Sequence, residues 1–203
     1  YRAMSSIALE KIEEFEPQGL SNMAWSFATV RIRDLPFMNA ISSAAMGKIT
    51  SFKPQALANT VWSCAQVVYV DAPLLQAISS VSLQKLAEFE SLELATTAWA
   101  YSRLFCTDIP LLDAIASVAQ GRIKMSSLDD YSAALLLEAL IFRRDSQQAL
   151  EVLRTLEKQR TLGPKVWPGL GAMLAEFEER GEMSHEQELM GMFARSSMSG
   201  LGP

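Results

Sequence analysis

The sequence predicts an all-α protein, a right-handed α-solenoid of about four to five helical-hairpin repeats with a 37-residue period. The first observation is that the segment 15–25 returns as 52–62 and, with more differences, as 89–99. The second is that each segment has apolar residues at helical spacing and is followed by another amphipathic stretch. A fixed period between about 20 and 50 residues is typical of stacked supersecondary units.

The first helix of a repeat is expected over Pro54 to about Val68 and its equivalents. Pro17 and Pro54 suit the first turn, where proline supplies the helical φ and the missing N–H has no partner. The tryptophan of each repeat lies off the main apolar stripe, so this helix is apolar on two sides and should be buried between its neighbours. The stripe comprises Leu57, Val61, Cys64, Ala65 and Val68.

The second helix begins after an aspartate that recurs every 37 residues, at Asp34, Asp71, Asp108 and Asp145. An aspartate at this position accepts hydrogen bonds from the unpaired N–H groups of the first turn. The first three aspartates also have a proline two residues later. Residues expected to face inward are Met38, Ile41, Leu75, Ile78, Leu112 and Ile115.

The predicted solenoid covers residues 1–160, with a half repeat at 1–14 and units that start near 15, 52, 89 and 126. In the fourth unit Leu136 takes the tryptophan position, Tyr131 takes the position of Leu94, and Ser127 with Asp130 resembles a capping box. Atypical capping helices are expected at 161–195 and a flexible tail at 196–203.

The composition is that of an ordinary globular protein, with 203 residues, 49% apolar residues and a formal charge of -5. An acidic chain has no global attraction for polyanions, so any nucleic-acid site would be local. No apolar run is long enough to span a bilayer. The two cysteines, Cys64 and Cys106, are interpreted as small apolar residues in a reducing compartment. The chain starts at Tyr1, so a targeting segment is not visible.

The run F-x-P-Q-x-L-x-N-x-x-W-x-x-A, as in Phe52 to Ala65, resembles the octatricopeptide repeat and the related heptatricopeptide repeat. The resemblance covers roughly Tyr1 to Arg160. It implies a helical-hairpin solenoid that acts in RNA processing, stability or translation in a chloroplast or mitochondrion. Many such proteins end in a RAP domain, but residues 163–203 show no match to one, which argues against an RNA-cleaving or RNA-processing role.

One basic residue recurs near the end of each second helix, at Lys11, Lys48, Lys85 and Arg122. Such a ladder of cations, spaced by one repeat, could follow a phosphate backbone. The alternative is structural, because a cation at a helix C-terminus stabilises the helix dipole and would recur for that reason.

An amide pair recurs on the first helix, as Gln18 with Asn22 and as Gln55 with Asn59. Repeat proteins that bind single-stranded RNA read each base with two or three side chains of one repeat. The third unit has Leu92 and Thr96 at these positions. The alternative is that the amides join helix ends and loops of adjacent repeats.

Two further sets of residues have both a functional and a structural interpretation. Trp25, Trp62 and Trp99 could stack on bases, but their fixed position opposite leucine favours a packed core role. Arginines in the connections could form a basic rim, although solvated loop arginines are the simpler interpretation. They are Arg31, Arg33, Arg103, Arg143 and Arg144.

The sequence predicts no enzyme, cofactor, metal or small-molecule substrate. The single histidine, His185, cannot assemble a usual zinc site without cysteines nearby. Phosphate-binding, nucleophile-elbow and dinucleotide motifs are all missing from the sequence.

Two functional hypotheses remain. In the first, the protein is a non-catalytic RNA-binding module of organellar gene expression, and single-stranded RNA contacts the recurring cations and amides. In the second, which the acidic charge favours, it is a scaffold for a protein partner or an accessory subunit of a large organellar assembly.

Overall fold

The computed structural model describes residues 10–106, 109–125 and 128–142. These residues form seven α-helices and three short 3-10 turns, at Ile12–Glu14, Ile49–Ser51 and Leu86–Glu88, with no strand. The helices are α2 (Pro17–Thr29), α3 (Leu35–Met46), α4 (Pro54–Gln66), α5 (Ala72–Gln84), α6 (Ser91–Arg103), α7 (Ile109–Lys124) and α8 (Asp130–Phe142). The all-α prediction is confirmed for the described residues. Three predicted segments lie outside the described residues, namely the remainder of the fourth unit, the capping helices at 161–195 and the tail at 196–203.

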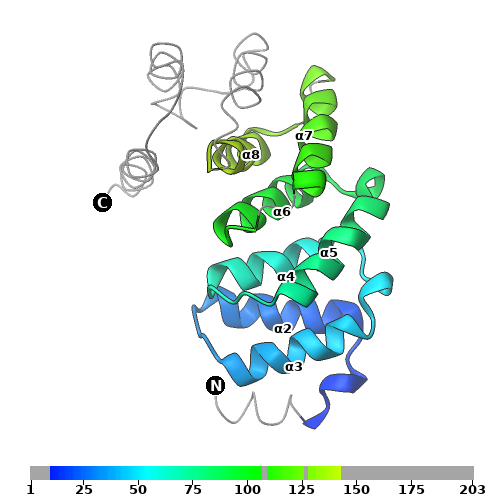
Figure 1. Ribbon diagram of the computed structural model, residues 1–203, viewed down its shortest axis with the longest axis vertical. Helices are drawn as coiled ribbons and strands as arrows, with labels where there is room; N and C mark the ends of the chain where they lie inside the picture. Colours follow the sequence, from blue (N-terminus) through cyan, green and yellow to red (C-terminus); the bar gives the residue numbers. More distant parts are fainter. Residues whose placement is uncertain (1–9, 107–108, 126–127, 143–203) are drawn as a thin grey trace, which may run out of the picture.

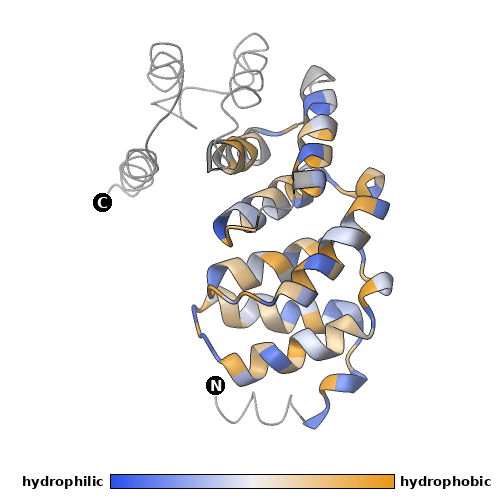
Figure 2. Ribbon diagram, in the orientation of Figure 1, coloured by the Kyte–Doolittle hydropathy of each residue, from blue (hydrophilic) through white to orange (hydrophobic). Residues whose placement is uncertain are grey.

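The helices lie in two rows that follow the order of the chain (Figure 1). Helices α2, α4, α6 and α8 pack side by side in one row, and α3, α5 and α7 pack against each other in the second. Each hairpin contributes one helix to each row, as in the contacts of α2 with α3 and of α4 with α5. Hydrophobic and hydrophilic residues alternate along the helices (Figure 2), as expected where each helix has a buried and an exposed side.

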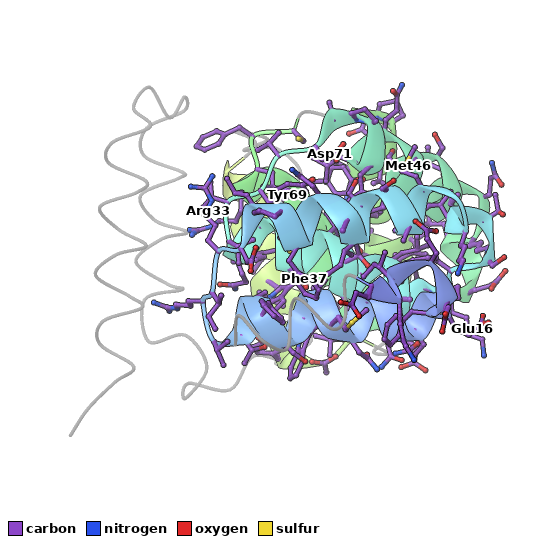
Figure 3. All side chains as sticks on the ribbon, turned by 90° about the horizontal axis from the view of Figure 1, so that it is seen from below. Glu16, Arg33, Phe37, Met46, Tyr69 and Asp71 are labelled. Carbon is purple, nitrogen blue, oxygen red and sulfur yellow. The ribbon has the colours of Figure 1, made fainter. Side chains whose placement is uncertain are left out.

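The core contains one leucine from each of the first three units, at Leu20, Leu57 and Leu94. All six residues predicted to face inward from the second helices are buried. Phe37 of α3 packs on Phe27 of α2 with ring centroids 4.3 Å apart, and Figure 3 shows Phe37 between these two helices. The helical spacing of the sequence therefore predicts this core correctly except at Val68, which is 64% exposed because α4 ends at Gln66.

The helix starts follow the predicted local chemistry. Proline occupies the first turn of α2 and α4, and Asp34 and Asp71 cap α3 and α5. The carboxylates accept hydrogen bonds from the backbone N–H of Phe37 at 3.2 Å and of Leu74 at 3.1 Å. These two predicted caps are confirmed, whereas Asp108 and Asp145 lie outside the described residues.

The fourth unit departs from the 37-residue alignment. Helix α8 begins at Asp130, and Asp129 accepts a hydrogen bond from the N–H of Ser132 at 2.9 Å. The predicted cap at Ser127 is therefore wrong. Tyr131 is 64% exposed, although it aligns with the buried Leu94. The departure is confined to the start of the helix, because Ser132, Leu137 and Ala139 are buried like Ala95, Ala100 and Ser102, which precede them by 37 residues.

Each of the first three hairpins turns through one residue with a positive φ, at Arg31 (55°), Val68 (51°) and Phe105 (54°). The following N–H donates back to a carbonyl near the end of the helix, as from Tyr69 to Cys64 at 2.8 Å. This hydrogen-bond pattern is that of a helix C-cap in which glycine is the usual residue. A side chain at such a φ costs roughly 1–2 kcal/mol, and a β-branched one is a genuine outlier.

Replacement of Val68 by glycine should raise the free energy of unfolding by about 1 kcal/mol, because it relieves the left-handed strain and the lost side chain is 64% exposed. Urea denaturation measures the change. The matched control is Val70→Gly, since Val70 is 60% exposed but does not have a positive φ. A Val68→Gly variant no more stable than wild type would show that the turn is unstrained.

Candidate functional site

Three of the four recurring cations donate to main-chain carbonyls of the preceding repeat. The ammonium of Lys48 donates to the carbonyl oxygens of Glu13 at 2.7 Å and Phe15 at 2.8 Å. These carbonyls end a 3-10 turn and precede α2, so they have no partner inside a helix. Lys48 therefore joins the end of one hairpin to the start of the hairpin before it.

The same contact recurs in the next two repeats. Lys85 donates to the carbonyls of Thr50 and Phe52, both at 2.8 Å. The Arg122 guanidinium donates to the carbonyl of Phe89 and, at 3.2 Å, to the Ser91 hydroxyl. We call these three contacts the cation clamps. Contacts between repeats explain why these cations recur. They support a structural role over phosphate binding, but the role is to join repeats and not to stabilise a helix dipole. Lys11 is exposed.

The three tryptophans differ in exposure. Trp25 is 45% exposed, so the packed core role predicted for it is wrong. Trp62 and Trp99 pack partly against the core and stay partly accessible. The rings of Trp25 and Trp62 are stacked with centroids 6.3 Å apart and planes inclined by 29°. The Arg103 guanidinium lies over the Trp99 ring, 5.4 Å from its centroid.

Tryptophans and amides share one face of the first helices. Residues 18, 22, 25 and 29 of α2 are spaced by four, three and four positions, which places them on the same side of the helix. Every member of this stripe is exposed or partly buried in α2, α4 and α6. We call it the tryptophan–amide face. Its members are Gln18, Asn22, Trp25, Thr29, Gln55, Asn59, Trp62, Gln66, Leu92, Thr96, Trp99 and Arg103.

The amides of this face are exposed or partly buried. Gln18 Nε2 donates to Asn22 Oδ1 at 3.0 Å within α2. Gln55 is exposed and Asn59 partly buried, and their side chains make no hydrogen bond within the described residues. None of the four amides joins neighbouring repeats there. Hydrogen-bonding capacity therefore remains available for a ligand.

The opposite edge of the hairpins has its own polar contact between repeats. Asp71 Oδ2 accepts from the Ser42 hydroxyl at 2.6 Å and from the Tyr69 hydroxyl at 3.0 Å. Figure 3 shows Tyr69 and Asp71 close together, at a distance from Glu16. Burial acts to raise the pKa of Asp71, but hydrogen bonds from Ser42, the Leu74 amide and Tyr69 outweigh it and lower the pKa. Burial, together with Asp71, raises the pKa of Tyr69 to about 12.

The other candidate residues offer little chemistry. Cys64 is buried as predicted, and burial raises the pKa of its thiol to about 12, so the reactive thiolate does not form near neutral pH. Arg33 donates to the Val68 carbonyl at 3.4 Å, Arg31 is exposed, and Arg143, Arg144 and His185 lie outside the described residues.

In the described ranges no three metal-ligating side chains gather. No described helix could cross a membrane.

No protein-family model matches the chain, and no curated protein sequence matches it. The resemblance to octatricopeptide repeats thus rests on the repeated residues themselves.

Replacement of Lys85 by methionine should lower the free energy of unfolding by about 1–3 kcal/mol, because two carbonyls lose a charged donor while the apolar part of the side chain is kept. Urea denaturation measures the loss. Lys53→Met is the matched control, since Lys53 is exposed and lies just before the first turn of α4. Equal stability of the two variants would contradict the clamp.

The pKa of Asp71 is lower in the folded chain than in the unfolded chain, so its stabilisation is present above about pH 4 and is lost as pH falls through the folded-state pKa. Asp71→Asn should therefore reduce the loss of stability between neutral and acidic pH. Thermal unfolding at a series of pH values measures this. Asp129 also has a lowered pKa and remains in the variant as an internal reference. An unchanged pH profile would rule out this role for Asp71.

Proposed function

We propose that the protein is a non-catalytic binding module, a right-handed α-solenoid whose tryptophan–amide face binds single-stranded RNA. Repetition of one hairpin and the two rows of helices support the solenoid. The single observation that carries the RNA proposal is that two successive repeats place an exposed or partly buried indole beside amides, at Trp25 and Trp62. Aromatic rings stack on unpaired bases, and amides pair with base edges.

In this proposal RNA binds mainly by stacking on the tryptophans, whereas the sequence also indicates phosphate binding by the recurring cations. The cations at Lys48, Lys85 and Arg122 donate to main-chain or hydroxyl oxygens, so they contribute less to phosphate binding than a free ladder would. Affinity should therefore come mainly from stacking, at roughly 1–3 kcal/mol per base. The resemblance to octatricopeptide repeats supports a role in organellar gene expression.

A protein-binding scaffold is the second candidate, and the formal charge of -5 together with the clamped cations favours it. An accessory subunit of a large organellar assembly would use the same accessible face. A pull-down from an organelle extract separates the two candidates. Partners that persist after ribonuclease treatment support the scaffold, and partners that all disappear support RNA.

Single-stranded RNA should bind at about 50 mM salt, and binding should weaken only slightly at about 200 mM because few phosphates are neutralised. Trp62→Ala should lower the affinity about tenfold, since it removes a stacking surface. Fluorescence anisotropy with labelled RNA measures both effects.

Two controls make this prediction specific. Leu35→Ala removes an exposed apolar side chain of α3, which belongs to the other row of helices, and it should leave the affinity unchanged. Lys85→Met should lower stability while the affinity of the folded fraction changes by less than about twofold. Folded wild-type protein that binds no single-stranded RNA at low salt would refute the RNA proposal.

A further inference from the structure

Arg103 is the charged member of the tryptophan–amide face. It is the last residue of α6, and its side chain is exposed. The equivalent residues of α2 and α4 are Thr29 and Gln66, which are uncharged. Because α4 and α6 pack side by side, Arg103 lies one repeat along the face from Trp62. A strand that lies across the indoles of successive repeats therefore meets a positive charge when it reaches α6.

The ring of Trp99 holds the Arg103 guanidinium in place. The guanidinium lies over this ring, 5.4 Å from its centroid, which is within the range of a cation–π contact. A side chain held in this way loses less conformational freedom on binding a ligand than a freely rotating one does. The N–H donors of Arg103 make no hydrogen bond or ion pair with another residue that the structure describes. They are therefore positioned at the surface and available to a ligand.

Four other cations donate to the protein itself. Lys48, Lys85 and Arg122 form the cation clamps, and Arg33 donates to the Val68 carbonyl. None of these four cations belongs to the tryptophan–amide face. Arg103 differs from them both in its position, on that face, and in its partner, an aromatic ring.

The chemistry of a guanidinium suits one group of an RNA strand, the backbone phosphate. Its donors form a planar fork that can bind two oxygens of one phosphate, and these charge-assisted hydrogen bonds are stronger than neutral ones. Phosphate contacts fix the position of a bound strand, whereas contacts to bases select its sequence. The uncharged members of the face in α2 and α4 suit bases, so α6 adds a contact of the first kind.

We propose that Arg103 binds one backbone phosphate of the single strand and so fixes the strand on the tryptophan–amide face beside the bases that stack on Trp25 and Trp62. This inference rests on the proposed RNA-binding function and adds the site of its phosphate contact. Trp99 is a positioning residue, because its ring orients the guanidinium. One phosphate contact accords with the weak salt dependence expected for this face.

The salt dependence of RNA affinity tests the phosphate site. One contacted phosphate gives a slope of about −0.7 for log affinity against log salt concentration. Arg103→Gln should bring this slope close to zero and weaken binding at low salt about fivefold, whereas Arg103→Lys should keep the slope. Lys53→Gln is the matched control, since Lys53 is exposed and precedes the start of α4, whereas Arg103 lies at the end of α6.

A strand with a neutral backbone provides the second arm of the test. A 2′-O-methyl oligonucleotide with methylphosphonate linkages is compared with its phosphodiester counterpart. The wild-type protein should bind the neutral strand about fivefold more weakly than the charged one. Arg103→Gln should bind the two strands equally, because the variant and the neutral strand each lack one half of the same contact. Circular dichroism and urea denaturation confirm that each variant is folded.

The outcomes separate this proposal from the function on which it rests. RNA binding whose salt slope Arg103→Gln leaves unchanged overturns the phosphate site but keeps the RNA function. An equal loss of affinity of Arg103→Gln for the charged and the neutral strand also overturns the site, since the guanidinium would then stack on a base. Folded wild-type protein that binds no single-stranded RNA at low salt overturns both proposals.

Discussion

The arrangement of the hairpins depends on the contact between a cation and the main chain of the repeat before it. A 3-10 turn and the start of a first helix leave carbonyl oxygens unpaired at every junction, and such groups are costly when they are partly buried. Lys48 and Lys85 each supply two hydrogen bonds to these oxygens. An ammonium on a long side chain reaches across the junction, and its charge strengthens both hydrogen bonds. The clamp therefore joins each hairpin to its neighbour at the edge where the 3-10 turns lie.

The opposite edge is held by different chemistry. Asp71 caps its own helix and also accepts from Ser42 of the preceding hairpin, so one carboxylate serves a helix end and a contact between repeats. The turns at this edge run through Val68 and its equivalents in the left-handed region. Because both edges are fixed and the apolar faces lie between the helices, one side of each first helix remains accessible. The tryptophan–amide face is that side.

Local chemistry made much of the fold predictable. The prolines that open α2 and α4 and the aspartates that cap α3 and α5 act within a few residues of their own position, so a pattern in the sequence reveals them. The cation clamps could not be predicted in this way, because Lys85 and its acceptors are 33 and 35 residues apart. The fixed position of tryptophan opposite leucine predicts a core residue, but Trp25 is 45% exposed. The spacing of Gln18, Asn22 and Trp25 already places all three on one face.

The recurring cations and the tryptophan–amide face have separate proposed roles, the first in holding the repeats together and the second in binding RNA. Ultraviolet cross-linking of bound single-stranded RNA, followed by mass spectrometry of the cross-linked peptides, distinguishes the two roles. We expect cross-links on the peptides that contain Trp25 and Trp62. Cross-links concentrated at Lys48, Lys85 and Arg122, with none at the tryptophans, would contradict it.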